Sequence, residues 1–170
     1  MNRKLAPVMI LLLSTLLLQA CGFQLRGTGT TAAKLPAYIS PLHIEGLALN
    51  DDMRRVLILL IQNDSVQVTE EKGEAASVLR IRNQRRDSRV LAIDAGGKAV
   101  ESELFEGLQF DLVDSKGVTL VSQQNLSATR SFINAEVLIL GKQEEEKSLR
   151  RTMRRDMARQ MVVRLSSQLQ

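Results

Sequence analysis

Two groups of arginines are the residues whose type and spacing point most directly to chemistry. Five arginines lie between residues 80 and 89, with one acidic residue among them. Seven basic residues lie between 147 and 164, again with one acidic residue. A guanidinium pairs well with phosphate or carboxylate. The groups therefore indicate either an anion-binding or partner surface or, more simply, the solvated faces of a strand and a helix.

Residue types that support catalysis or metal binding are scarce. The only histidine is His43 and the only cysteine is Cys21, so the chain has no pair of Cys/His ligands for zinc. It has no nucleophile motif and no phosphate-binding glycine loop, and Ala95-Gly96-Gly97 is typical of a hairpin turn. We therefore expect a protein that is not an enzyme, with no catalytic residue, no metal and no cofactor other than a covalent lipid.

That lipid is expected on Cys21. Residues 5–18 are almost wholly apolar and follow two basic residues, but a spanning helix needs about 20 apolar residues, so the segment is typical of a secretory signal. Leu18-Gln19-Ala20-Cys21-Gly22 resembles a bacterial lipobox. The resemblance implies that residues 1–20 are cleaved and that Cys21 carries a diacylglycerol and an N-acyl chain. Gly22 resembles the residue found at this position in lipoproteins sorted to the outer membrane.

Composition limits the remaining chain to one ordinary globular domain. About 150 residues remain after cleavage, enough for a single core, and the 44% hydrophobic content excludes a disordered chain. Without the two basic residues of the signal, 21 Lys and Arg stand against 19 Asp and Glu. With this balance, no Trp and a single Tyr, a nucleic-acid partner is not expected.

The pattern along the chain predicts a tether followed by alternating elements. Residues 21–41 form the lipidated N-terminus and tether, and residues 42–170 form a single domain. A short strand is expected at 42–45, and a well-buried helix that includes Leu59 is expected to follow the N-cap Asn50. Three long strands are expected at 77–94, 99–114 and 118–132. Short turns between them predict an antiparallel meander.

The last element is a long helix. Methionine and leucine recur at every fourth residue from Leu149 to Leu169. This step drifts about 40° per repeat on a helix of 3.6 residues per turn, so the apolar stripe winds around the helix. Such a stripe fits a helix that crosses a twisted sheet obliquely. The acidic residues Glu144–Glu146 are interpreted as its first turn.

Several segments, in this order, resemble the LptE family of lipopolysaccharide-assembly lipoproteins. They are Cys21-Gly22-Phe23-Gln24-Leu25-Arg26-Gly27, Leu91-Ala92-Ile93-Asp94 with Gly97-Lys98-Ala99, Thr129-Arg130-Ser131-Phe132, and the helix from Glu144 to Leu165. The resemblance implies an α+β two-layer sandwich, a mostly antiparallel β-sheet with two α-helices packed on one face. It also implies an outer-membrane lipoprotein on the periplasmic or barrel-lumen side, where it plugs an LptD-like β-barrel and binds and delivers lipopolysaccharide.

The resemblance further implies where lipopolysaccharide binds. In the family, basic residues of the sheet hairpin and of the loop before the last helix take part. Lys142 occupies the loop position, directly after Leu140-Gly141. At the hairpin tip this chain has Asp94-Ala95 where a basic residue is expected, so Lys98 or Arg89 is the hairpin candidate.

Two other classes remain open. One is an accessory envelope lipoprotein of another lipid-transport complex, or a structural envelope lipoprotein. The other is an envelope enzyme, for which the chain offers no catalytic groups.

Overall fold

The computed structural model describes residues 34–62, 66–133 and 139–170, with side chains in the last range from Gln143 onward. The expected signal peptide, Cys21 and the first part of the tether lie outside the described residues. The described elements are β1 (Leu42–Glu45), α2 (Asp52–Gln62), β2 (Val68–Thr69), β3 (Ser77–Ile93), β4 (Ala99–Asp114), β5 (Thr119–Ile133) and α3 (Ile139–Leu169), with 3-10 turns at Ala37–Ile39 and Lys72–Glu74.

The five strands form one sheet in the order β2-β1-β3-β4-β5. β3, β4 and β5 are antiparallel, which confirms the meander. In both connecting turns an aspartate carboxylate, of Asp94 or Asp114, accepts backbone N–H groups. A glycine, Gly97 or Gly117, then takes a positive φ angle. β1 pairs in parallel with β2 and β3, because α2 lies in the crossover that a parallel pair requires.

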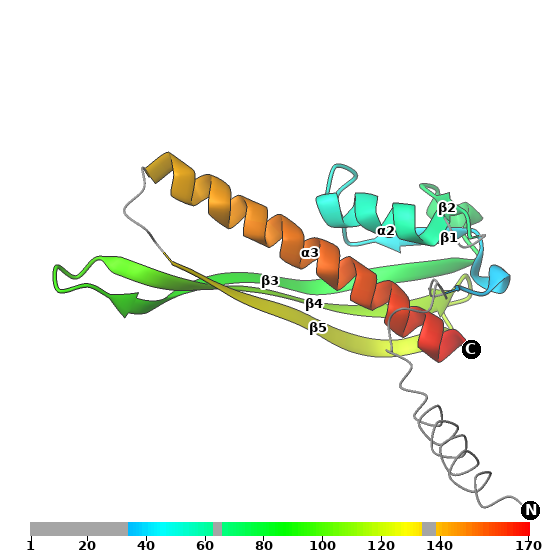
Figure 1. Cartoon of the computed structure of the whole chain (residues 1–170). Helices are drawn as coiled ribbons and strands as arrows, with labels where there is room; N and C mark the ends of the chain where they lie inside the picture. Colours follow the sequence, from blue (N-terminus) through cyan, green and yellow to red (C-terminus); the bar gives the residue numbers. More distant parts are fainter. Residues whose placement is uncertain (1–33, 63–65, 134–138) are drawn as a thin grey trace, which may run out of the picture. The chain divides into compact units, whose positions relative to one another are not determined.

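Both helices lie on one face of the sheet, so the fold is the expected two-layer α+β sandwich (Figure 1). Leu79 and Ile81 of β3 lie opposite Leu112 and Phe110 of β4, and all four are buried between the layers. α3 adds Met157, Ala158, Met161, Val162 and Leu165 to this core. We call the sheet face away from the helices the open face.

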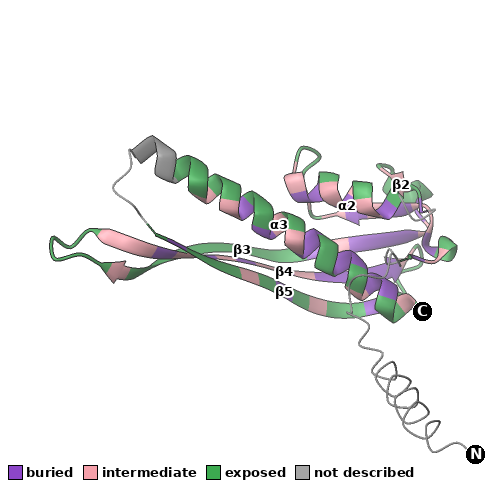
Figure 2. Cartoon of the chain, viewed as in Figure 1, coloured by how far each residue is buried: buried purple, intermediate pink, exposed green. Residues whose placement is uncertain are grey.

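Burial divides the long strands into two halves (Figure 2). The covered half comprises residues 77–81, 108–114 and 119–126, and it contains the main core. The hairpin half comprises residues 82–93, 99–107 and 127–133. There every residue from Arg82 to Leu91 is exposed, and the apolar packing is a small cluster of Leu104, Phe132 and Met153.

The helix α2 begins one residue later than expected, and its buried face is narrower than the sequence predicted. Its N-cap is Asp51, whose carboxylate accepts the N–H of Met53, so Asn50 is not the cap. Leu59 is 63% exposed and does not widen the buried face. Arg54, by contrast, is only 2% exposed and donates to the Ile44 carbonyl oxygen and the Glu70 carboxylate. Periodicity alone did not indicate this buried cation.

The apolar stripe of α3 is confirmed, because Met153, Met157, Met161 and Leu165 are buried. The start of the helix differs from the expectation. α3 begins at Ile139, so the segment 144–146 lies beyond the first turn. Lys142 consequently lies within the first turn of the helix and not in a loop before it.

The folded part of the chain extends to the N-terminal side of Leu42. Leu35 and Ile39 are buried in the main core, and the Ser77 hydroxyl donates to the Ile39 carbonyl oxygen. The end of the expected tether is therefore part of the domain. Within the described residues, no helix combines the length and apolar character needed to cross a membrane.

Candidate ligand-binding site

A bulge in β3 collects four arginines on the open face. Arg82 lies opposite Gln109 and Arg85 lies opposite Gly107, so β3 advances three residues while β4 advances two. The extra residue is accommodated at Asn83, whose φ angle is +48°. Because side chains alternate along a strand, this offset brings Arg82 and Arg85 to the same face. They share it with Arg80 and Arg89.

Acidic neighbours neutralise most of these arginines. Arg80 pairs across the strands with Asp111, and Arg89 Nε lies 2.6 Å from Glu103 Oε1. Arg85 lies 3.2 Å from Asp87 on its own strand. Arg82 has no ion partner among the described residues. The first arginine group is therefore chiefly a row of ion pairs, which a reading of charge along the chain could not reveal.

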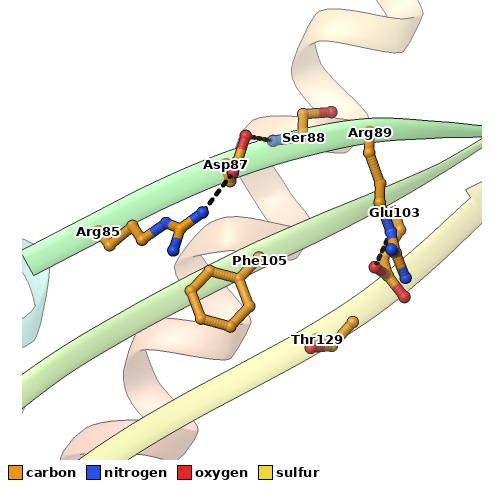
Figure 3. Close-up of a pocket in the computed structure, with 7 residues that line it drawn as sticks. All are labelled: Arg85, Asp87, Ser88, Arg89, Glu103, Phe105 and Thr129. Atoms are coloured by element: carbon orange, nitrogen blue, oxygen red, sulfur yellow. Dashed lines mark hydrogen bonds and ion pairs between the residues drawn. The ribbon is translucent and has the colours of Figure 1, made fainter.

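A cavity of about 390 Å³ opens on this face within the hairpin half (Figure 3). We call it the open-face pocket. It is lined by Arg85, Asp87, Ser88, Arg89, Glu103, Phe105 and Thr129. The three strands contribute these residues side by side, since Asp87, Phe105 and Thr129 form one row across the sheet.

Phe105 forms the floor of the open-face pocket. Its ring lies over Gly107, because a Cβ atom at Gly107 would come within 2.9 Å of the ring. The guanidinium carbon of Arg85 lies 5.6 Å from the ring centroid, within cation–π range. Figure 3 shows the ring face-on, with Arg85 to one side and Glu103 and Thr129 to the other.

Asp87 is held as a carboxylate at the rim of this pocket. The backbone N–H of Ser88 and, after it, the guanidinium of Arg85 donate hydrogen bonds that lower the pKa of Asp87 below its usual value. Asp87 is therefore a charged acceptor in neutral solution. Asp87 and Glu103 balance Arg85 and Arg89, so the four charged residues have no net charge.

A second concave region lies on the helix side of the sheet, near the N-terminus of α2. This helix-side groove has a volume of about 330 Å³ and is lined by Asp51, Asp52, Arg86, Lys147, Arg150, Arg151 and Arg154. Its cations are mostly paired: Lys147 with Glu144, and Arg154 with Asp51 at 2.6 Å. Among the described residues, Arg151 is the one lining cation without an ion partner.

Glu106 lies beneath the helix-side groove and joins three elements. It is 4% exposed, and its Oε1 accepts from Arg86 of β3 and Arg150 of α3 at 3.0 and 2.9 Å. Burial by itself would lower the pKa of Arg150, but the hydrogen bonds that its guanidinium donates to Glu146 and Glu106 outweigh burial and raise that pKa above its usual value. The buried carboxylate therefore stays paired with permanent cations, which limits its desolvation cost.

The predicted ligand residues lie toward the hairpin end of the domain, and the predicted lipidation site lies outside the described residues. Lys98 is exposed in the β3–β4 turn and has no ion partner among the described residues. Arg89 is 72% exposed but paired with Glu103. Lys142 is in the first turn of α3, where side chains are not described, and Cys21 lies outside the described residues. The β3–β4 turn and the start of α3 lie toward the same end of the domain (Figure 1).

Sequence reasoning missed Glu106 and Phe105. Glu106 lies two residues from both Leu104 and Leu108, so the alternation of side chains along the strand already placed it on the buried face. Phe105 lies on the opposite face of the strand, two residues before Gly107. That pairing of an outward aromatic with a glycine in a strand was the available signal for a flat floor on the open face.

The fold is one that this chain shares with small bacterial lipoproteins. A minor lipoprotein from Acinetobacter baumannii has a TM-score of 0.64 at 24% identity, covering 78% of this chain and 94% of its own. The uncharacterized lipoprotein B from Nitrosomonas europaea has a TM-score of 0.66 at 24% identity, covering 86% and 91% respectively.

The sequence defines the family. The model of the LptE family, described as Lipopolysaccharide-assembly, matches residues 38–165. The LPS-assembly lipoprotein LptE from Photorhabdus laumondii is 24% identical over 157 residues, which cover 92% of this chain and 83% of that relative. The chain belongs to the LptE family. It is therefore a lipopolysaccharide-assembly protein and not an enzyme.

Proposed function

We propose that this protein is an outer-membrane lipoprotein that binds lipopolysaccharide and assists its delivery to the cell surface together with an LptD-like β-barrel. The observation that carries the proposal is the family match over residues 38–165, which runs through both helices and all three long strands. The protein resides on the periplasmic or barrel-lumen side.

The anchor of this protein is the lipid on Cys21. The lipobox pattern of residues 18–22 supports it, and so does the word lipoprotein in the name of the Photorhabdus relative. Each buried methylene of an acyl chain contributes about 0.8 kcal/mol, so several chains hold a protein firmly at a membrane.

Lipopolysaccharide phosphates bind at the hairpin end of the domain. Lys98 is the hairpin cation, because it is exposed and lacks an ion partner among the described residues. Lys142 is the second cation, and the position of the first turn of α3 toward the same end supports its role (Figure 1). Arg89 contributes less, since it is already held by Glu103.

The partner is tested by purification from envelope extracts. The tagged, lipidated chain is cross-linked in intact cells, and its partners are identified by mass spectrometry, with Cys21→Ser as the unanchored control. Recovery of a large outer-membrane β-barrel is expected. Recovery of an inner-membrane transport complex or of cell-wall material in its place would favour the accessory-lipoprotein alternative.

The ligand cations are tested by the double change Lys98→Glu with Lys142→Glu. Each charge-assisted hydrogen bond contributes about 1.5–3 kcal/mol, so loss and repulsion together should weaken lipopolysaccharide binding at least about tenfold. Lys116→Glu is the matched control, because Lys116 is exposed in the β4–β5 turn at the other end of the sheet. Unchanged binding by a folded double variant would exclude these two lysines.

A further inference from the structure

The open-face pocket offers a flat apolar surface, the ring of Phe105, that lies close against the backbone of the sheet. Gly107 leaves room for the Phe105 ring against the sheet, and the contact of 2.9 Å that a Cβ would make shows how closely the ring lies on the backbone. The guanidinium carbon of Arg85 lies over the ring, 5.6 Å from its centroid. Figure 3 looks onto the sheet with the helix behind the strands, and the ring is turned face-on toward the viewer. A planar group that stacks on this face of the ring would lie beside the Arg85 guanidinium and contact it.

The polar rim around this ring is balanced and not cationic. Arg89 is held by Glu103 at 2.6 Å, and Arg85 is held by Asp87 at 3.2 Å. A phosphate would have to displace a carboxylate from one of these pairs and would then face both acids. A neutral ligand with many hydroxyls can instead hydrogen-bond to the pairs as they stand.

The rim supplies both kinds of partner that hydroxyl groups need. Carboxylate oxygens of Asp87 and Glu103 accept from hydroxyl donors, and the guanidinium N–H groups of Arg85 and Arg89 donate to hydroxyl oxygens. Thr129 lines the same pocket with a hydroxyl that does both. A pyranose ring combines an apolar C–H face with hydroxyls around its edge, so it matches an aromatic floor inside a polar rim.

We propose that the open-face pocket is a saccharide-binding subsite that stacks one neutral pyranose ring of lipopolysaccharide on Phe105. The volume of about 390 Å³ is within the range of small-ligand pockets. This inference rests on the proposed function, and it assigns the sugar part of the ligand to the open face. The phosphates stay with Lys98 and Lys142 at the hairpin end.

The test uses the full lipidated chain in a detergent without a sugar headgroup, since a glycoside detergent would compete. The probe is the oligosaccharide released from lipopolysaccharide by complete deacylation and then dephosphorylated, and binding is followed by saturation-transfer NMR and calorimetry. Intact lipopolysaccharide is measured in parallel. A cell-wall disaccharide is the competing sugar.

The variants separate ring stacking from folding. Phe105→Leu keeps an apolar side chain but removes the flat ring, and it should weaken oligosaccharide binding about tenfold. Phe105→Tyr keeps the ring and should bind as the unchanged protein does. Gly107→Ala places a methyl group against the ring and should weaken binding although Phe105 itself is not substituted. Thr129→Val removes one hydroxyl and should weaken binding less. Circular dichroism checks that each variant is folded.

Several outcomes would overturn the subsite. These are unchanged oligosaccharide binding by folded Phe105→Leu, oligosaccharide binding only before dephosphorylation, or preference for the cell-wall disaccharide. The subsite is also wrong if the unchanged protein binds intact lipopolysaccharide but not the oligosaccharide. Failure to bind intact lipopolysaccharide at all would instead contradict the proposed function.

Discussion

The covered half and the hairpin half of the sheet are made from the same three strands, yet different forces hold them. In the covered half, Leu79, Phe110 and Leu112 are fully buried under the helices. In the hairpin half, ion pairs such as Arg89–Glu103 lie on the surface, where each contributes at most about 1 kcal/mol. Stability is therefore concentrated at one end of the domain, and the other end can present charges and an aromatic ring to a ligand.

Glu106 lies where the two halves meet. Its carboxylate connects the hairpin half to α3 through Arg150, and Arg154 continues the connection to Asp51 at the start of α2. The hairpin half is thus not independent of the core. It is attached to α3 through this buried set of charges and through the apolar cluster of Leu104, Phe132 and Met153.

The largest effect is expected from Met157→Asp in the covered half. Met157 is 1% exposed in the main core, and a carboxylate there would be buried without a partner. We expect a loss of at least about 4 kcal/mol, enough to prevent folding of a marginally stable domain. Thermal unfolding followed by circular dichroism measures it, with exposed Gln160→Asp on the same helix as control. A normal melting temperature for Met157→Asp would contradict the packing of α3.

A smaller loss is expected from Glu106→Ala at the junction. Removing one partner of a buried ion pair costs about 3–5 kcal/mol. Because Arg150 keeps its hydrogen bond to Glu146, we expect a loss near the lower end of that range. Urea unfolding measures this loss. Glu144→Ala breaks the exposed pair with Lys147 and should change the free energy of unfolding far less, because solvent screens a surface pair. If Glu106→Ala and Glu144→Ala lower the free energy of unfolding by the same amount, Glu106 does not join the two halves.

The two turn glycines give a matched comparison of the ends of the sheet. Gly97 and Gly117 both have positive φ angles, and neither has a neighbour within 4 Å of an added Cβ. Alanine at either site should therefore cost about 1–2 kcal/mol through backbone strain alone. For Gly117→Ala this should appear in global unfolding. For Gly97→Ala it should appear mainly as faster hydrogen exchange of hairpin amides. An equal loss of global stability from both variants would argue against a less stable hairpin half.

The smallest expected effect concerns Glu70 and pH. The hydrogen bond from Arg54 lowers the pKa of Glu70 below its usual 4.5. A carboxyl group whose pKa is lower in the folded state than in the unfolded state stabilises the fold at pH values above its unfolded-state pKa. That stabilisation is lost as the pH falls through the pKa of the folded state. Because Glu70 is 58% exposed, Glu70→Gln should cost only about 0.5–1 kcal/mol at pH 7.

Urea unfolding between pH 7 and pH 3 checks this effect, and the difference between Glu70→Gln and the unchanged protein should shrink below pH 4.5. Glu103→Gln in the hairpin half is the comparison variant and should leave global stability nearly unchanged. A difference for Glu70→Gln that grew toward low pH would reverse the sign and exclude the Arg54 contact as its cause.

Much of the fold was determined by the sequence itself. The alternation in β3, β4 and β5, the turns at Asp94 and Asp114, and the stripe of α3 are local signals, and each depends on residues a few positions apart. The structure confirmed them for that reason. Resemblance to the LptE family added the two-layer arrangement, which no single segment specifies.

Only the tertiary structure decided which charges are buried and which residues form a site. The bulge at Asn83 gathered the arginines on one face, and Arg54 became buried although its neighbours along the helix gave no sign of it. Glu106 meets Arg150 from 44 positions away in the chain. The burial and pairing of a charge depend on residues that are distant in sequence. The periodicity of a segment therefore placed these side chains on one face of an element but did not determine which residues they would contact.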